Sequence, residues 1–184
     1  RRVLIGCEYS GIVRDAFTAR GWDAWSCDVL PTERPGQHII NDVRNVLDWD
    51  WDLAVFHPPC TYLANSGVQH LYIGGKKENG IDAKRWHNMV EAAEFFKALW
   101  QSDIPRIAIE NPVMHGYGKQ RIGVEQSQVI NPFEYGHGEQ KATCLWLRNL
   151  PLLKPTHIVA GREQRIWRLP PGEDRWKERS RTFT

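Results

Sequence analysis

The chain has 184 residues, of which 41% are hydrophobic and 25% are charged, and its formal net charge is +2. These values are typical of an ordinary globular domain and argue against disordered, fibrous and membrane proteins. No apolar run approaches the roughly 18 residues of a membrane span and no signal peptide begins the chain, so we expect one domain in the cytoplasm, away from any membrane.

The first sixty residues alternate short apolar runs with turns. Residues 2–6 (Arg-Val-Leu-Ile-Gly) predict a buried strand, which is followed by a turn at Ser10-Gly11 and a helix over 12–20. Strands are also expected at 24–27 and around 38–40, and each is followed by an acid. The apolar run 53–56 stops before Pro58-Pro59, so it predicts a buried parallel strand.

The middle of the chain continues this alternation. Apolar residues recur at helical spacing over 82–100, and a strand is expected at 106–109. After residue 112 the pattern weakens, and 144–147 is the one clear strand. The sequence therefore predicts an α/β fold, a mostly parallel sheet with helices on both faces, which binds ligands beyond the carboxyl ends of its strands. The residues expected on that edge are Ser10, Asp28, Asp42, Cys60 and Glu110.

Cys60 is the candidate nucleophile. Prolines restrict the backbone, so a cysteine directly after Pro58-Pro59 is rigidly held, which suits a thiolate that must approach a flat ring at one angle. An arbitrary cysteine is more often a small buried hydrophobe. The loop position and the nearby strand end at Glu110 favour reactivity here, because a buried carboxyl group can protonate a ring nitrogen while the thiolate attacks the adjacent carbon.

The four cysteines are widely spaced and contain no Cys-x-x-Cys pair. Neither a disulfide framework nor a zinc finger is therefore indicated. A metal site built from His57, Cys60, His137 and Cys144 matches no zinc spacing, so we expect no metal.

Two motifs resemble those of DNA cytosine-5 methyltransferases. Pro58-Pro59-Cys60, followed by residues 63–67 (Leu-Ala-Asn-Ser-Gly), looks like their Pro-Cys motif, and residues 109–113 (Ile-Glu-Asn-Pro-Val) look like their Glu-Asn-Val motif. The order of the motifs is similar over about residues 3–113. The resemblance implies a Rossmann-like, S-adenosylmethionine-dependent methyltransferase fold. It also implies methyl transfer to carbon 5 of cytosine in DNA through a covalent cysteine adduct.

The resemblance further implies roles for single residues. Cys60 would add to carbon 6 of cytosine and Glu110 would engage nitrogen 3, while Pro58, Pro59 and Asn111 support the loop. The implied cofactor contacts are Tyr9, Ser10 and Gly11 with the methionine, Asp28 with the ribose, and Asp42 and Val43 with the adenine. The implied substrate contacts are Tyr62, Ser66, Gly67, Lys141 and Thr143, with Tyr62 receiving a base that has left the duplex stack.

The chain departs from this family in three places. Its first turn, residues 6–11, lacks the Phe-x-Gly sequence of the family's first motif. Because this turn contains Glu8, recognition of a modified form of the cofactor stays open. The Gln-x-Arg-x-Arg motif has only residues 140–143 (Gln-Lys-Ala-Thr) as its nearest counterpart. The residues from about 149 onward form a short, irregular, basic segment, too short for a target-recognition region. We therefore expect a single catalytic domain over 1–184, similar to compact phage enzymes that work in the host-cell cytoplasm, with a specificity subunit or an oligomer left open.

Three other functions stay open. An amino-group DNA methyltransferase carries an Asp/Ser/Asn-Pro-Pro-aromatic motif in the place of His57-Pro58-Pro59-Cys60, but Cys60 and His57 both depart from it. The same carbon 5 chemistry on a free cytosine nucleotide would explain the missing recognition region. A non-catalytic subunit that binds DNA or the cofactor is disfavoured by the pair Cys60 and Glu110, which mere binding does not need.

Overall fold

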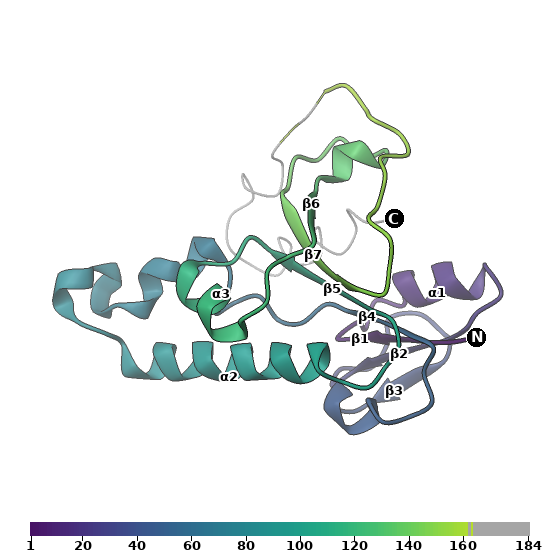
Figure 1. Ribbon diagram of the computed structural model, residues 1–184, viewed down its shortest axis with the longest axis horizontal. Coiled ribbons are helices and arrows are strands. Elements are labelled where there is room, and N and C mark those ends of the chain that lie inside the picture. The colour runs from purple at the N-terminus through teal and green to yellow at the C-terminus, as the bar shows by residue number, and fades with distance from the viewer. Residues whose placement is uncertain (162, 164–184) are drawn as a thin grey trace.

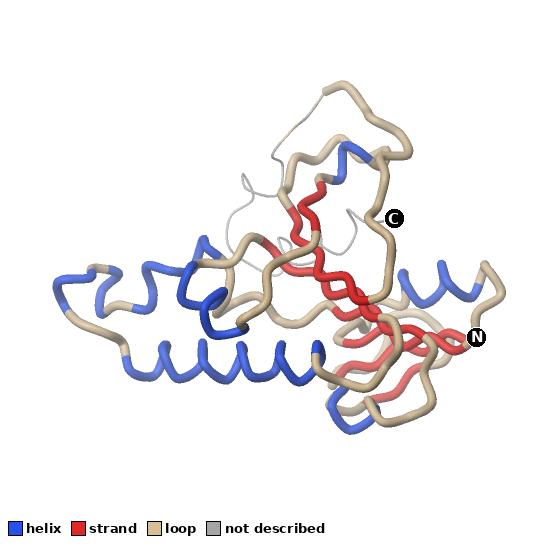
Figure 2. Tube along the Cα trace, in the orientation of Figure 1, coloured by secondary structure: helices blue, strands red, loops and turns tan. Residues whose placement is uncertain are grey.

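The structure is a computed structural model, which describes residues 1–161 and 163. A single twisted sheet forms its centre. Within these residues seven strands follow the order β3-β2-β1-β4-β5-β7-β6 (Figures 1 and 2). The strands are β1 (Arg2–Gly6), β2 (Asp23–Asp28), β3 (His38–Ile40), β4 (Leu53–Phe56), β5 (Ile107–Pro112), β6 (Gln128–Ile130) and β7 (Thr143–Arg148). The strands β1 to β5 run parallel to one another, and β7 runs antiparallel to β5 and β6. This arrangement confirms the predicted α/β fold with a mostly parallel sheet.

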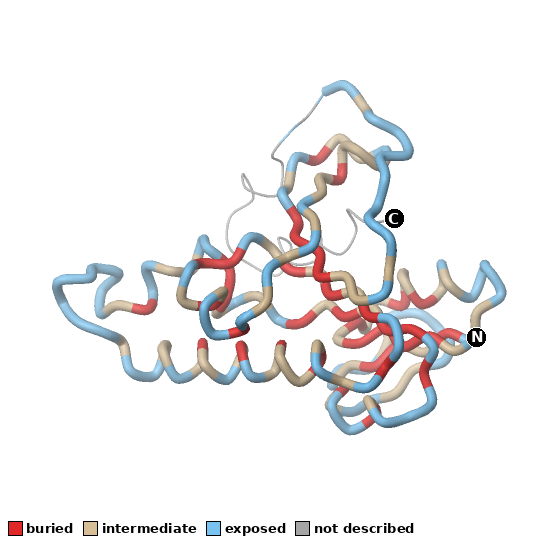
Figure 3. The backbone as a smooth tube through the Cα atoms, in the orientation of Figure 1, coloured by how far each residue is buried: buried red, intermediate tan, exposed pale blue. Residues whose placement is uncertain are grey.

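Helices cover both faces of the sheet, as the alternating pattern predicted. Alternate residues of β1 point to opposite faces. Val3 and Ile5 pack in one cluster with Phe17 of α1 (Ile12–Thr18), whereas Leu4 packs in the other with Phe96 of α2 (Ala83–Trp100). Figure 1 shows α1 and α2 on opposite sides of the strands, and Figure 3 shows that buried residues are concentrated in the central strands.

The long helix α2 begins and packs as its sequence dictates. Asp82 caps it, because its carboxylate accepts a hydrogen bond from the backbone NH of Arg85 at 2.9 Å. The buried positions, three or four residues apart as a helix requires, are Met89, Ala93, Phe96 and Leu99. A shorter helix, α3 (Gly116–Ile122), packs on it, with the rings of Tyr117 and Trp86 5.1 Å apart.

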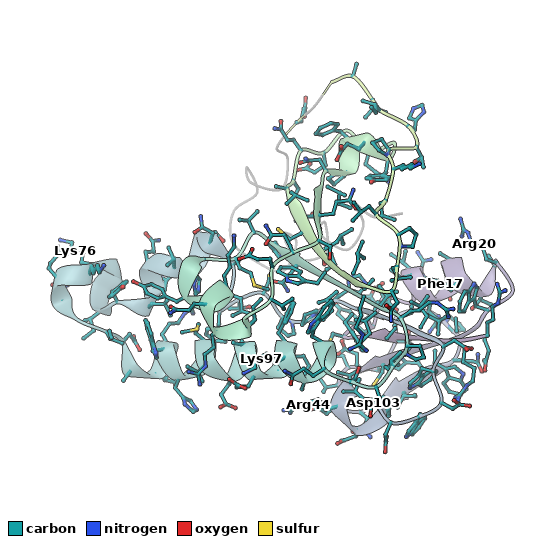
Figure 4. The ribbon with its side chains drawn as sticks, viewed as in Figure 1. Phe17, Arg20, Arg44, Lys76, Lys97 and Asp103 are labelled. Atoms are coloured by element: carbon teal, nitrogen blue, oxygen red, sulfur yellow. The ribbon has the colours of Figure 1, made fainter. Side chains whose placement is uncertain are left out.

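Short 3₁₀ turns complete the described chain. Two of them, η1 (Val43–Val46) and η5 (Pro132–Glu134), follow β3 and β6. The others, η2 (Asn65–Leu71), η3 (Ile73–Gly75) and η4 (Lys77–Asn79), lie between β4 and α2. This second group projects away from the sheet, to the left in Figure 1, and Lys76 lies near its end (Figure 4).

The structure shifts several predicted boundaries. The first helix ends at Thr18 rather than residue 20, because the chain turns there and Gly21 adopts a positive φ of 79°. The fifth strand continues to Pro112, three residues beyond 109, because it pairs along its length with β7. The strand β6 and the helix α3 had no counterpart in the sequence pattern.

Gly6, the last residue of β1, is expected to tolerate no side chain. A Cβ atom there would lie 2.5 Å from Cδ1 of Phe56 and 2.7 Å from Cγ2 of Val43, both buried. We expect Gly6→Ala to lower the free energy of unfolding by about 1–3 kcal/mol, because the ring must move within a packed core. Urea unfolding measures the change. Gly116→Ala, where a Cβ meets no atom within 4 Å, is the matched control and should be neutral or slightly stabilising.

The described residues contain no helix that is both long and apolar enough to cross a membrane. Most of the predicted basic carboxyl-terminal segment, from residue 162 on except residue 163, lies outside the described residues. The domain organisation therefore stays a prediction.

Candidate active site

The carboxyl ends of β1, β4 and β5 lie side by side at one edge of the sheet. From β1 the chain proceeds outward to β2 and β3, and from β4 it proceeds to β5 on the other side, so the strand order reverses between β1 and β4. Open α/β sheets bind their ligands in the crevice at such a reversal. The two strand ends are joined there, because the backbone NH of His57 donates to the carbonyl of Gly6 at 3.0 Å.

The loop that carries Cys60 is fastened to β5. The side-chain amide of Asn111, a residue only 1% exposed, donates from Nδ2 to the carbonyl of Pro58 at 2.9 Å. The loop then folds over the carbonyl of Cys60, which accepts from the backbone NH groups of Leu63 (3.1 Å) and Ala64 (2.9 Å). The Pro-Cys and Glu-Asn motifs, about 50 residues apart in sequence, are therefore in direct contact.

A buried histidine fixes the far side of the same loop. Nδ1 of His115 accepts from the backbone NH of Gly118 at 3.0 Å, so Nε2 carries the proton and donates to the carbonyl of Tyr62 at 2.9 Å. The backbone NH of His115 also donates to the carbonyl of Leu63 at 3.0 Å. The segment leading into α3 thus holds residues 62 and 63 in place. Sequence reasoning missed His115, because nothing in its neighbourhood marks it.

Two residues of α2 hold the Tyr62 side of the loop. Arg85 lies 4.5 Å from the centre of the Tyr62 ring and donates to the carbonyl of Thr61 at 3.1 Å, while Asn88 donates to the Tyr62 hydroxyl at 3.2 Å. Nε of Arg85 is buried and has no hydrogen-bond partner within the described residues. Arg85 is therefore a cation beside the predicted substrate contact Tyr62 that the sequence analysis did not single out.

His57 joins the ends of β4 and β5. Its Nδ1 lies 3.4 Å from Oε2 of Glu110, and both side chains are largely buried, with exposed fractions of 28% and 21%. An imidazole at this distance can share a proton with the carboxyl group. The sequence analysis gave His57 no role in the proposed chemistry, and its contact with Glu110 adds it to the candidate site.

Three buried polar atoms at this edge have no hydrogen-bond partner among the described residues. They are Oε2 of Glu8, Nε2 of His57 and Oδ1 of Asn111, and they belong to the neighbouring strand ends of β1, β4 and β5. An unsatisfied buried polar atom costs about 1–3 kcal/mol, so such atoms are rare in a finished core. Because open α/β sheets bind ligands beyond such strand ends, a polar ligand bound there would complete the hydrogen bonding of these atoms.

The predicted cofactor contacts line the same edge on the β1, β2 and β3 side. Gly11, at the start of α1, has a positive φ of 75°, and the hydroxyl of Ser10 accepts from the backbone NH of Ile12 at 3.3 Å. Tyr9 lies in the same turn and is half-buried, and Asp28 ends β2 and accepts from the backbone NH of Leu30 at 3.0 Å. The structure thus brings these residues to the predicted crevice and leaves their roles as predictions.

Asp42 and Val43 begin η1 beyond the end of β3. The Asp42 carboxylate accepts from the backbone NH of Arg44 at 2.9 Å and pairs with its guanidinium at 2.6 Å. The guanidinium of Arg44 lowers the pKa of Asp42 below its ordinary value. Val43 is 3% exposed and packs in the core. Asp42 therefore offers an ionised carboxylate just beyond the end of β3, whereas the side chain of Val43 contributes to the hydrophobic core.

The predicted substrate contacts lie in different elements of the structure. Tyr62 belongs to the Cys60 loop, whereas Ser66 and Gly67 lie in η2, the turn that follows it. Thr143 opens β7 opposite Pro112, is fully buried, and donates from its hydroxyl to the carbonyl of Lys141 at 3.2 Å. Thr143 is therefore next to the Glu-Asn motif, with its hydroxyl already engaged by the backbone.

The cysteines differ in how burial affects their acidity. Burial raises the pKa of Cys27 to about 11, and it also raises the pKa values of Cys7 and Cys144 above the ordinary value. For Cys27 this means about 100-fold less thiolate at pH 8 than an ordinary thiol has. Cys60 is half-buried at the end of the Pro-Pro loop.

We expect iodoacetamide at pH 8 to modify Cys60 before Cys27 and Cys144. The thiolate is the reacting species, and those two cysteines are buried and have raised pKa values, whereas Cys60 is half-buried. Modification of Cys27 should appear only as the pH approaches 11 or when the protein unfolds. Peptide mass mapping over a time course measures the order. Faster modification of Cys27 or Cys144 than of Cys60 in the folded protein would contradict the expectation.

Among the described residues, no group of three or more His, Cys, Asp or Glu side chains is arranged to hold a metal ion.

The comparisons with known proteins concern the fold. No family model matches the chain, and no curated protein matches it. One similar solved structure is described as a DNA modification methyltransferase encoded within an E. coli prophage, with a TM-score of 0.47 and 12% identity, covering 92% of this chain and 55% of that one. Another is the S. pombe Dnmt2 methyltransferase, with a TM-score of 0.41 and 12% identity, covering 83% and 50%. The chain spans about half the length of these structures.

Proposed function

We propose that this protein transfers a methyl group from S-adenosylmethionine to carbon 5 of cytosine in DNA, with Cys60 as the nucleophile. One observation carries the proposal, the hydrogen bond from Asn111 to the carbonyl of Pro58. It ties the loop of the predicted nucleophile to the strand of the predicted acid, Glu110. Two motifs that resemble catalytic motifs in sequence therefore form one site in space.

The crevice also suits the cofactor. S-adenosylmethionine would supply an electrophilic methyl group on a positively charged sulfur. The turn of residues 8–11 and the acids Asp28 and Asp42 surround the strand ends where open α/β sheets bind nucleotide-like ligands. The buried Oε2 of Glu8 has no hydrogen-bond partner among residues 1–161 and 163, and it fits a ligand that brings hydrogen-bond donors and positive charge.

The residues of the site can perform the chemistry on the base. The thiolate of Cys60 would form a bond from Sγ to carbon 6 of the ring. Glu110 would hold a proton at nitrogen 3, so that the electrons of the carbon 5–carbon 6 double bond become available at carbon 5. After carbon 5 has been methylated, its proton would pass to a water molecule. The electron pair left at carbon 5 would re-form the carbon 5–carbon 6 double bond and expel Sγ of Cys60 as a thiolate, and the proton at nitrogen 3 would return to Glu110. His57, in contact with Glu110, would keep the carboxyl group oriented.

A labelling experiment with the wild-type protein tests the proposal. The protein is incubated with methyl-labelled S-adenosylmethionine and either duplex DNA, single-stranded DNA or deoxycytidine monophosphate, and the nucleosides are then identified by mass spectrometry. We expect 5-methyldeoxycytidine from a DNA substrate. Label on an exocyclic amino group would favour an amino-group methyltransferase, and label only on the monophosphate would favour the nucleotide enzyme. The absence of label from every substrate would overturn the proposal for this chain.

A further inference from the structure

The turn after β1 contains a buried carboxylate that the motifs do not explain. Glu8 is only 7% exposed. One of its oxygens, Oε1, accepts a hydrogen bond from the hydroxyl of Ser10. The other, Oε2, is buried and has no hydrogen-bond partner within the part of the chain that the structure describes. Glu8 therefore presents one satisfied oxygen and one unsatisfied oxygen.

The backbone around Glu8 is held firmly. The backbone NH groups of Cys7 and Glu8 both donate to the carbonyl of Cys27 on β2, at 2.8 and 3.3 Å, and Cys7 adopts a positive φ of 59°. This conformation is uncommon for a residue other than glycine. The fixed turn and the contact with Ser10 together hold the carboxylate at the end of β1, beside the reversal of strand order where ligands bind.

The basic residues Arg14, in α1, and Arg34, in the loop after β2, pair with groups other than Glu8. Arg14, fully buried in α1, donates to the Asp15 carboxylate at 2.8 Å and to the carbonyls of Arg34 and Pro35 at 3.2 and 3.0 Å. Arg34 itself lies 3.9 Å from Asp15. Because a buried carboxylate oxygen without a donor is costly, a cationic donor from a ligand would stabilise this one.

We infer that Glu8 binds the primary ammonium group of the methionyl part of the cofactor. The inference rests on the proposed function and adds a specificity residue to it. The sulfonium sulfur has no hydrogen to donate, the adenine amino group is uncharged, and the methionyl carboxylate would be repelled by Glu8. The ammonium group alone combines positive charge with several hydrogen-bond donors, and the contact would be a charge-assisted hydrogen bond.

Calorimetric titration of wild type and Glu8→Gln with two ligands tests the inference. S-adenosylhomocysteine carries the ammonium group, and 5′-methylthioadenosine has the same thionucleoside without the amino-acid part. We expect Glu8→Gln to lower the affinity for S-adenosylhomocysteine by about 10- to 100-fold, the usual effect of losing a hydrogen bond to a charged group. The affinity for 5′-methylthioadenosine should change by less than about twofold.

Thermal unfolding without ligand separates binding from folding. Glu8→Gln removes a buried charge and leaves the size of the side chain unchanged, so its Tm should equal or exceed that of wild type. Glu33→Gln is the matched control, because Glu33 is exposed, on a loop whose backbone donates to the carbonyl of Tyr9 at 2.9 Å. The affinity of Glu33→Gln for S-adenosylhomocysteine should be unchanged within about twofold, as expected for an exposed surface charge.

Each other outcome points to a different failure. If wild type binds S-adenosylhomocysteine and Glu8→Gln binds it equally well, the inference is overturned and the proposed function stands. An equal loss for both ligands would mean that Glu8 shapes the turn and does not contact the ammonium group. If wild type binds neither S-adenosylmethionine nor S-adenosylhomocysteine, the proposed function and the inference both fail.

Discussion

Replacing Cys60 by alanine is expected to reduce methyl transfer by about 10⁴-fold or more, the order of loss when a covalent nucleophile is removed. Without Sγ no bond forms to carbon 6, and carbon 5 of a neutral cytosine is then too weakly nucleophilic to accept a methyl group. Single-turnover transfer of labelled methyl to DNA measures the rate. Titration with S-adenosylhomocysteine should show unchanged affinity, because Cys60 lies on the β4 loop and the predicted cofactor contacts lie at the ends of β1, β2 and β3.

Thr61→Ala provides the matched control for this loss. Thr61 follows Cys60 in the same loop, is exposed, and contributes its carbonyl, which the substitution retains, to the bond from Arg85. Its transfer rate should stay within about threefold of wild type, as is usual for a surface substitution. Transfer by Cys60→Ala at a rate near that of Thr61→Ala would remove Cys60 from the mechanism, whatever product the wild-type enzyme makes.

Glu110→Gln should lower the transfer rate by about 10²- to 10⁴-fold, the usual contribution of a general acid. Glutamine keeps the shape of the side chain and can still meet His57 Nδ1, but it cannot deliver a proton to nitrogen 3 of the ring. The loss should appear in kcat at saturating DNA and cofactor, with little change in the affinity for S-adenosylhomocysteine. Rapid-quench measurement of the first turnover separates the chemical step from product release.

The control for Glu110→Gln is Glu125→Gln, which makes the same change at an exposed position beyond α3. Its kcat should equal that of wild type. If Glu110→Gln also retained full kcat, the carboxyl group would serve only to hold His57. The proton at nitrogen 3 would then have to come from another group.

The sequence pattern predicted the central strands well, because each is a short apolar run that ends at a turn or a proline. It missed α3 because the helix GYGKQRI has two glycines and little apolar periodicity. Tertiary contacts stabilise it instead, with His115 capping its first turn and Gly118 packing closely on Leu63. It missed β6 because that strand has three residues, one of them the exposed Val129, and forms by pairing with β7.

The candidate site also contains residues that the sequence pattern could identify and contacts that it could not. Cys60, Glu110 and Asn111 could be found from local motifs, because each lies in a short motif that contains proline and follows an apolar run. The contacts of His57, Arg85 and His115 could not, because they join residues 24 to 53 positions apart. Such contacts depend on which strands become neighbours and on which side of α2 faces the loop. The periodicity of a single sequence shows neither the order of the strands nor which side of α2 faces the loop.

The bond between Asn111 and Pro58 has a consequence for how the site is assembled. Asn111 lies on β5, whose Ile107 and Ile109 are fully buried in the core, and Pro58 follows β4, which pairs with β5. The geometry around Cys60 is therefore established by the same strand pairing that closes the centre of the sheet. Local opening could release the peripheral turns η2 to η4 and leave this pairing intact. The Cys60 loop, in contrast, is tied to this pairing, so we expect it to lose its shape together with the core.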